Sequence, residues 1–174
     1  MELLKEINHK ENLNKNGRII KREAVRGIVL DDEKVLMILS NLNDYKFPGG
    51  GVENGETYEE TLLREIKEEC GALVSRIEEC IGKVIEYNKP IEKEYDVFQM
   101  TSFYYICNVE ENHCRTNLDK YEKKLGFKPV WINIMDAIQN NKSIINSSST
   151  ETPRWTRRDT FVLKFVYKMN RNKN

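Results

Sequence analysis

Apolar and polar residues alternate along much of this chain with the two-residue period of β-strands. Two short runs rich in apolar residues, 24–30 (AVRGIVL) and 34–40 (KVLMILS), are separated by a turn-like Asp-Asp-Glu, and this arrangement predicts a hairpin. The same alternation predicts further strands at residues 72–87, 96–110 and 128–134, with an edge strand over residues 1–7.

Helical spacing replaces this alternation in other segments. Residues 56–70 are expected to form a helix that ends at Gly71, because glycine suits the left-handed conformation that follows many helices. The core face of this helix is predicted to consist of Leu62, Leu63, Ile66 and Cys70. Residues 134–141 predict a second, short helix.

The last helix is expected over residues 154–174. Thr156 and Asp159 have the spacing of a capping box at its start. The stripe that it buries would consist of Val162, Phe165, Val166 and Met169. Because there is no internal repeat and no clear linker, residues 1–174 are expected to form one mixed α+β domain, with residues 1–18 as an N-terminal extension or edge strand.

The charge balance of the chain argues against one class of partner. There are 28 Lys and Arg residues and 28 Asp and Glu residues, so the formal net charge is zero. A protein that grips long nucleic acid through its phosphates needs a basic surplus. The charge is unevenly placed, and from Pro153 onward seven basic residues face one Asp. We therefore expect no long nucleic acid as a partner.

The N-terminal residues and the cysteines indicate a cytoplasmic protein. The chain does not begin with a basic start and an apolar run, so no signal peptide is expected. No apolar run approaches the roughly 18 residues of a membrane span, so no membrane partner is expected either. The four cysteines form no CxxC pair and are expected to be reduced thiols. The sequence leaves the oligomeric state open, and a homodimer is one option.

A cluster of acidic residues follows a run of glycines. Seven glutamates lie between Glu53 and Glu69, behind glycines 49–51. On a helical wheel Glu65, Glu68 and Glu69 are neighbours, and like charges at this spacing repel each other. A solvated acidic face is the ordinary explanation of such a helix. These carboxylates border the predicted apolar face, however, and a hard cation such as Mg²⁺ would bind their oxygens and cancel the repulsion.

The same segment resembles the Nudix box of the Nudix hydrolase (MutT-like) family. The pattern of this box is G-x5-E-x7-R-E-U-x-E-E-x-G-U, where U is a bulky aliphatic residue. The chain matches it with Gly50, Glu56, Arg64, Glu65, Ile66, Glu68, Glu69 and Gly71. Ala72, at the last position, is smaller than the usual residue, which affects packing more than chemistry. In layout the resemblance extends over most of residues 20–140.

The resemblance implies an α/β/α sandwich with a mixed β-sheet, in which the box forms a loop, a helix and a loop. It also implies a hydrolase that acts on nucleoside diphosphates linked to another group, with Mg²⁺ or Mn²⁺ as cofactor. By position, the metal ions would be held by the main-chain carbonyl of Gly49 and the carboxylates of Glu65, Glu68 and Glu69. Arg64 and Glu56 would fix the geometry of the loop and helix, and Gly50 and Gly71 are structural positions of the box.

The residue that would act as general base stays open, because members of the family differ. Glu68 and Glu69 are candidates within the box. Outside the box Glu122 is preferred, since it comes shortly before the strand expected from residue 128. Glu110 and Glu111 compete with it.

Residues outside the box would select the substrate. Arg26 interrupts an apolar strand, and it would either point into the cleft toward the substrate or pair with a surface acid. Trp155 would either stack on a base, with the neighbouring arginines 154, 157 and 158 meeting phosphates, or fasten the last helix to the body. The second interpretation of Trp155 is favoured.

Several functions fit these features. The leading hypothesis is hydrolysis of a phosphoanhydride bond in a small nucleotide, and the compact size favours an intact or oxidised nucleoside triphosphate over ADP-ribose or a nucleotide sugar. A non-catalytic module that senses nucleotides is the alternative from another class. It is disfavoured because every carboxylate of the box is present. An enzyme that processes RNA ends would need a stronger basic path.

Overall fold

The computed structural model describes residues 1–147 and 152–171, with the side chains of residues 111–113 outside the described part. Eight strands form two four-stranded sheets. The first sheet has the order β1 (Leu3–Asn8), β6 (Ala72–Asn88), β7 (Val97–His113) and β2 (Ile19–Ile28). The second consists of β3 (Leu30–Asp31), β4 (Lys34–Leu39), β5 (Tyr45–Lys46) and β8 (Lys128–Asn133).

The first sheet is mixed. β1 lies parallel to β6, β2 lies parallel to β7, and the two long strands β6 and β7 pair antiparallel. The second sheet is antiparallel, with β4 between β3 and β5 at one edge and β8 at the other. The predicted strands 72–87, 96–110 and 128–134 are therefore confirmed, and none of their ends differs by more than three residues.

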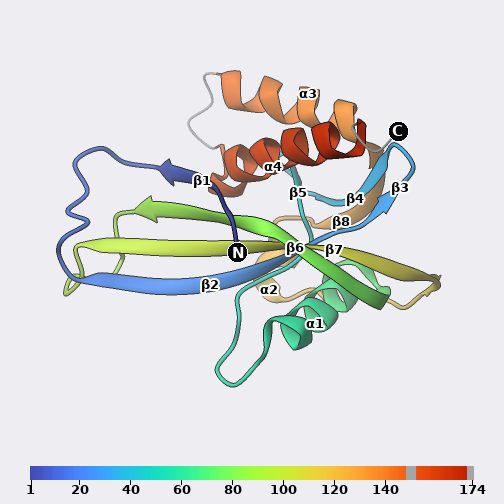
Figure 1. Ribbon diagram of the computed structural model, residues 1–174, viewed down its shortest axis with the longest axis horizontal. Helices are drawn as coiled ribbons and strands as arrows, with labels where there is room; N and C mark the ends of the chain where they lie inside the picture. Colours follow the sequence, from blue (N-terminus) through green and yellow to red (C-terminus); the bar gives the residue numbers. More distant parts are fainter. Residues whose placement is uncertain (148–151, 172–174) are drawn as a thin grey trace.

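Helices cover the sheets on both sides. Figure 1 shows α3 (Ile134–Asn146) and α4 (Arg154–Arg171) together above the sheets, and α1 (Tyr58–Cys70) below them. α2 (Lys120–Lys124) is a single short turn near α1. This arrangement is the α/β/α sandwich with a mixed sheet that the resemblance implied. Within the described residues, no helix is long and apolar enough to span a membrane.

Two hydrophobic cores form because the buried strands point alternate residues to opposite faces. In β4, Val35 and Met37 pack with the core under α3 and α4. Leu36 and Ile38 pack instead with the core over α1. A strand that is covered on both faces reads as an unbroken apolar run, which explains the sequence VLMIL.

The predicted hairpin is correct only at its tip. Leu30 pairs with Val35 and Asp31 with Lys34, but residues 24–28 belong to β2 and pair with β7 in the other sheet. The chain therefore passes from one sheet to the other after residue 28. Alternation of apolar and polar residues identifies a strand but not the strand it pairs with. The sequence pattern therefore could not distinguish pairing of residues 24–28 within a hairpin from their pairing with β7.

α1 begins two residues later than predicted. Thr57 is its N-cap and forms a capping box with Glu60, so Glu56 lies before the helix. Gly71 ends the helix in the left-handed conformation, as expected, with φ 65°. The predicted core face was wrong for Leu63, which is 44% exposed. The buried face of the helix is rotated away from Leu63, so that it includes Glu65 and Glu69.

The predicted capping box of the last helix was also wrong. α4 begins at Arg154, which places Thr156 and Asp159 inside the helix, where both are buried. Thr156 Oγ1 donates a hydrogen bond to Asp44 at 2.7 Å, and Asp159 accepts hydrogen bonds from the Phe47 N–H at 3.0 Å and the Tyr104 hydroxyl at 2.7 Å. These polar residues therefore hold α4 against the segment that leads into the glycine loop.

The other helices differ less from expectation. The predicted helix at residues 134–141 continues to Asn146. In α4, Val162 and Val166 are buried as predicted, whereas Phe165 and Met169 are only partly buried and Leu163 completes the buried face.

Asp159 should be essential for stability because its carboxylate also pairs with the buried Arg158, whose Nε lies 2.8 Å away. Asp159→Ala leaves that guanidinium short of a partner in the core, and we expect the free energy of unfolding to fall by about 3–5 kcal/mol. Urea denaturation measures this change. Asp136→Ala, at an exposed position in the first turn of α3, should cost less than about 1 kcal/mol. Equal losses in the two variants would contradict this account of α4.

Candidate functional site

The glycine loop runs beside β2 and brings its main chain close to α1. The carbonyls of Pro48 and Gly50 accept hydrogen bonds from the N–H groups of Gly27 and Val25, at 2.9 and 3.0 Å. Gly49 has a φ of 131°, and a side chain there would overlap the Val25 carbonyl. A side chain on Gly50 would occupy the place of the Glu65 carboxylate. The backbone approach therefore requires glycine at Gly49, whereas a side chain at Gly50 would have to displace the Glu65 carboxylate.

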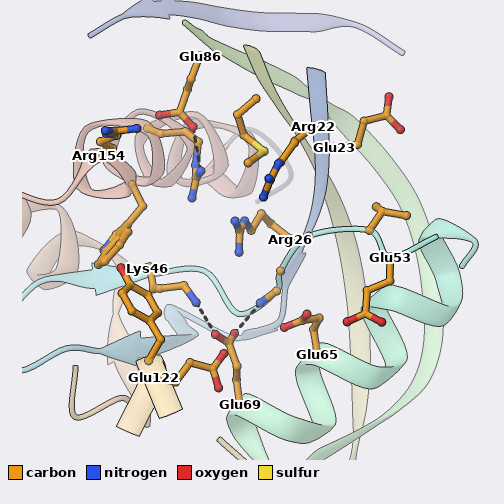
Figure 2. Close-up of a pocket in the computed structure, with 18 of the residues that line it drawn as sticks. Arg22, Glu23, Arg26, Lys46, Glu53, Glu65, Glu69, Glu86, Glu122 and Arg154 are labelled. Carbon is orange, nitrogen blue, oxygen red and sulfur yellow. Dashed lines mark hydrogen bonds and ion pairs between the residues drawn. The ribbon is translucent and has the colours of Figure 1, made fainter. Parts of the chain in front are cut away.

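Three carboxylates meet beside this loop. Glu65 and Glu69 lie on the inner face of α1, and Glu122 reaches them from α2. One oxygen of each lies within 4.8 Å of the others, and Figure 2 shows the three side chains converging at one end of a cleft. Glu69 is only 1% exposed and Glu65 9%. Negative charges so close together, and so shielded from water, require compensation.

Arg64 provides compensation on one side. It holds Glu56 through two hydrogen bonds, from Nε at 2.6 Å and from Nη2 at 2.8 Å, and its Nη1 donates to Glu65 at 2.7 Å. Glu68 lies outside the three-carboxylate cluster and is 3.4 Å from Arg64 Nη1. Arg64 thus fastens the segment before α1 to the helix and orients the Glu65 carboxylate toward the cleft.

Lys46 and Gly49 provide compensation on the other side. The Lys46 ammonium forms an ion pair with Glu69 Oε1, and the Gly49 N–H donates to Glu69 Oε2 at 2.7 Å. Figure 2 marks the Lys46–Glu69 pair as a dashed line. Lys46 is itself buried, on β5, so both oxygens of Glu69 have partners within the protein.

Protonation of the other two carboxylates follows from their surroundings. Burial, together with the nearby Glu69 charge, raises the pKa of Glu65, although Arg64 opposes this shift. Burial is also the main reason that the pKa of Glu122 is raised, again with a contribution from Glu69. A cation bound among these groups would favour their ionised forms.

Oxygen atoms dominate this end of the cleft, which fits a hard divalent cation. Mg²⁺ prefers oxygen ligands, and carboxylates are its common protein ligands. The Gly49 carbonyl offers a further oxygen, since it accepts no hydrogen bond from the described residues whereas its neighbours Pro48 and Gly50 do. The donor set of Glu65, Glu69, Glu122 and Gly49 is therefore suited to such an ion.

Arg26 faces these carboxylates across the cleft. Figure 2 shows it between the three glutamates and Glu86 at the opposite end. Its guanidinium forms no hydrogen bond with the described residues, and its Nε is shielded from solvent without a partner. Burial and the neighbouring Arg158 both lower the pKa of Arg26, yet a guanidinium remains charged in proteins. Arg26 is thus a half-buried cation on the cleft wall, with no ion-pair partner among the described residues.

The far end of the cleft is built by residues from both ends of the chain. Glu86 accepts hydrogen bonds from His9 at 2.8 Å and from Arg158 at 2.9 Å. Trp155 lines the cleft, and its indole N–H donates to Asp44 at 2.6 Å. Trp155 therefore fastens α4 to the body, the favoured interpretation, and presents part of its surface to the cleft. The whole cleft has a volume of about 1220 Å³, which is ample for a nucleotide.

The structure brings together most of the residues that the sequence singled out. Glu65, Glu69, Gly49, Gly50, Arg26 and Glu122 all line the cleft. Among the described residues Arg26 makes no ion pair with a surface acid, so that alternative was wrong. Glu110 is exposed and does not line the cleft, and the side chain of Glu111 lies outside the described part.

Sequence reasoning missed Lys46, His9 and Glu86. Lys46 stands in the short segment YKFPGGG, and a lysine just before a glycine-rich loop is ordinarily interpreted as a surface residue. A signal was present, since Lys46 is flanked by two aromatic residues that suggest burial. His9 and Glu86 gave no signal, because their contact joins residues that are 77 positions apart.

The chain belongs to the NUDIX domain family. The profile of the NUDIX domain matches residues 20–152, most of the chain. This match includes the whole glycine loop, the acidic helix and the Glu122 turn. It leaves out His9 and α4, which form part of the far end of the cleft.

Similar proteins agree with this assignment. An ADP-ribose pyrophosphatase of Methanocaldococcus jannaschii is 46% identical over 63 residues, which are 34% of this chain and 37% of that protein. The chain thus matches little more than a third of the length of that relative.

Solved structures support the fold. A NUDIX hydrolase from Nitrosomonas europaea matches with a TM-score of 0.59 and 18% identity, over 86% of this chain and 91% of that chain. A MutT structure, from a study of Aliivibrio salmonicida and Vibrio cholerae, matches with a TM-score of 0.52 and 18% identity, over 84% and 96% of the two chains.

The Arg64–Glu56 pair should make stability depend on pH in acid. The hydrogen bonds from Arg64 lower the pKa of Glu56 from about 4.5 to about 2. Because the folded-state pKa is depressed, this contribution to stability is present above pH 4.5 and is lost as the pH falls toward 2. Glu56→Gln should therefore lower the melting temperature at pH 7, and the difference from the wild type should shrink on acidification.

Glu59→Gln is the matched control for this measurement. Glu59 is exposed in the first turn of α1, and within the described residues it forms no ion pair. Its substitution should leave the melting temperature nearly unchanged from pH 7 to pH 2. A Glu56→Gln difference that stayed constant across this range would show that the Arg64 pair is not its source.

Proposed function

We propose that this protein hydrolyses a phosphoanhydride bond in a small nucleotide, with Mg²⁺ or Mn²⁺ as cofactor. The observation that carries the proposal is the opposition of two features in one cleft, the three carboxylates of Glu65, Glu69 and Glu122 and the unpaired guanidinium of Arg26. A pyrophosphate bound between them would be attracted by Arg26, whereas the glutamates would repel it unless a cation lay between. Membership of the Nudix family supports the same conclusion.

Glu65 and Glu69, with the Gly49 carbonyl, would hold the divalent ion. Glu68 would join them by turning from Arg64 toward the cleft. When bound, the ion would neutralise phosphate charge and make water more acidic. Arg64 and Glu56 would act through Glu65, by fixing the orientation of its carboxylate.

Glu122 is the preferred general base. Its carboxylate lies outside the box helix, within reach of the same space as Glu65 and Glu69. A water molecule attacking phosphorus must lose a proton as its oxygen forms the new P–O bond and the anhydride P–O bond breaks. A Glu122 oxygen would accept that proton. The raised pKa of Glu122 makes it a stronger base than an ordinary carboxylate, provided that it is ionised.

Arg26 would bind a phosphate oxygen of the substrate. Its Nε and terminal nitrogens offer a planar set of donors that suits phosphate. Because the Arg26 Nε is shielded from solvent and has no partner among the described residues, an incoming anion would supply a hydrogen bond that the protein does not.

Two substrate classes remain within the proposal. The compact domain favours a nucleoside triphosphate, intact or oxidised, and the similarity to an archaeal ADP-ribose pyrophosphatase favours ADP-ribose or a nucleotide sugar. The products separate them, since a triphosphate would give a nucleoside monophosphate and pyrophosphate, and ADP-ribose would give AMP and ribose 5-phosphate. A panel of both classes with Mg²⁺, followed by chromatography of the products, tests the proposal.

Substitutions on α1 should separate a metal site from an acidic surface. Glu65→Gln and Glu69→Gln should each lower kcat by about two orders of magnitude or more, because each removes a charged ligand. Glu60→Gln should change kcat less than about twofold, since glutamine also serves in a capping box. Steady-state kinetics on the best substrate of the panel measures these effects. Equal effects in all three variants would refute the metal site.

Arg26→Gln should weaken substrate binding more than folding. Loss of a charged hydrogen bond to phosphate should raise KM by about tenfold or more. The melting temperature should not fall, because the Arg26 guanidinium has no hydrogen-bond partner to lose among the residues that the structure describes. Arg76→Gln, at an exposed position on β6, should leave KM unchanged. An unchanged KM in Arg26→Gln would remove Arg26 from the substrate site.

A nucleotide sensor is the alternative function. It would bind nucleotide with Mg²⁺ and release no product over the whole panel. The complete box and the position of Glu122 argue against it, since a sensor needs neither a full set of carboxylates nor a base.

A further inference from the structure

Lys46 places a buried ammonium inside the carboxylate cluster. The residue is 6% exposed, and its Nζ contacts Glu69 Oε1. The same ammonium lies 4.5 Å from the centre of the Phe127 ring. A carboxylate on one side and an aromatic face on the other are both favourable neighbours for a cation with little access to water.

The backbone on which Lys46 sits is held on both sides. The Asn141 side chain accepts a hydrogen bond from the Tyr45 N–H at 2.9 Å and donates one to the Tyr45 carbonyl at 2.9 Å. On the other side, the Phe47 N–H donates to the buried Asp159 at 3.0 Å. Rotation about the side-chain bonds of Lys46 is therefore the simplest way for its ammonium to leave Glu69.

Lys46 and a divalent ion would compete for the same oxygen. Glu69 Oε2 already accepts the Gly49 N–H, and Oε1 is occupied by Lys46. A divalent ion bound to Glu69 Oε1 would displace the Lys46 ammonium. An ion bound elsewhere among the carboxylates would lie close to the positive charge of that ammonium. Both arrangements weaken the binding of the ion.

A nucleotide would remove this conflict. A displaced ammonium that stays in the cleft needs another anion, because an unpaired buried charge is costly. The phosphates of a nucleotide would lie in the same cleft, between the carboxylates and Arg26. Lys46 would then exchange a carboxylate oxygen for a phosphate oxygen while the metal ion takes its place at Glu69.

We propose that Lys46 couples the binding of metal to the binding of nucleotide. Without nucleotide its ammonium occupies Glu69 and lowers the affinity of the cluster for divalent ions. With nucleotide it transfers to a phosphate oxygen, so that each ligand increases the affinity for the other. This inference rests on the proposed function, because it takes Glu69 as a metal ligand. It adds a positioning residue that the Nudix box does not contain.

The test is a calorimetric titration of the whole protein with Mn²⁺, with and without α,β-methylene-ADP, whose P–C–P bridge resists hydrolysis. Without the nucleotide analogue, Lys46→Met should bind Mn²⁺ about tenfold more tightly than the wild type, within the usual range of coupling between sites. With the analogue present, the affinity of the wild type should rise by about tenfold, and that of Lys46→Met should rise much less.

Two further variants control the experiment. Lys67→Met removes the same charge from an exposed position on α1, and it should change Mn²⁺ affinity less than about twofold. Lys46→Arg keeps the positive charge and should keep the weak affinity of the wild type. If Lys46→Met does not fold, as circular dichroism would show, Lys46→Gln replaces it, since its amide can still donate to Glu69.

The possible failures are distinguishable. Equal Mn²⁺ affinities in the wild type and Lys46→Met, or an equal effect of the analogue on both, would overturn the role of Lys46 and leave the proposed function intact. If Mn²⁺ bound to neither protein, with or without the analogue, the metal site itself would be refuted and this inference with it.

Discussion

Repulsion among three glutamates is the constraint on which this site depends. Glu65, Glu69 and Glu122 place carboxylate oxygens within 4.8 Å of one another, and Glu65 and Glu69 are largely shielded from water. The groups that compensate this negative charge come from different elements. Arg64 acts from α1, Lys46 from β5 and the Gly49 N–H from the loop between them. The fold therefore has to deliver these groups at fixed positions, and Asp159 of α4 and Asn141 of α3 hold the loop and β5 to do so.

Some of the residues that line the cleft lie within the match to the family profile, and others lie outside it. The glycine loop, the acidic helix and Glu122 lie within the matched residues 20–152. His9, Arg154, Trp155 and Arg158 come from outside that match and also line the cleft. Membership of the family therefore describes the part of the cleft built by residues 20–152 and leaves the part built by His9 and α4 undescribed.

The sequence predicted which residues meet at the site better than it predicted how the elements pack. The box residues could be recognised because their spacing on one helix is local, and Gly71 ended that helix as glycine often does. Partners across the fold were harder to predict. Residues 24–28 alternate like a hairpin strand yet pair with β7, and Thr156 and Asp159 have cap spacing yet lie buried within α4. In each case a long-range hydrogen bond, which no local pattern records, decides the arrangement.

Anomalous diffraction from a crystal grown with Mn²⁺ and α,β-methylene-ADP tests the central claim most directly. The account predicts a manganese peak bounded by Glu65 and Glu69, near Glu122 and the Gly49 carbonyl, with phosphate density between that peak and Arg26. Lys46 should then no longer contact Glu69. Manganese found only at surface carboxylates such as Glu59, with the Lys46–Glu69 pair intact and nucleotide bound, would contradict it.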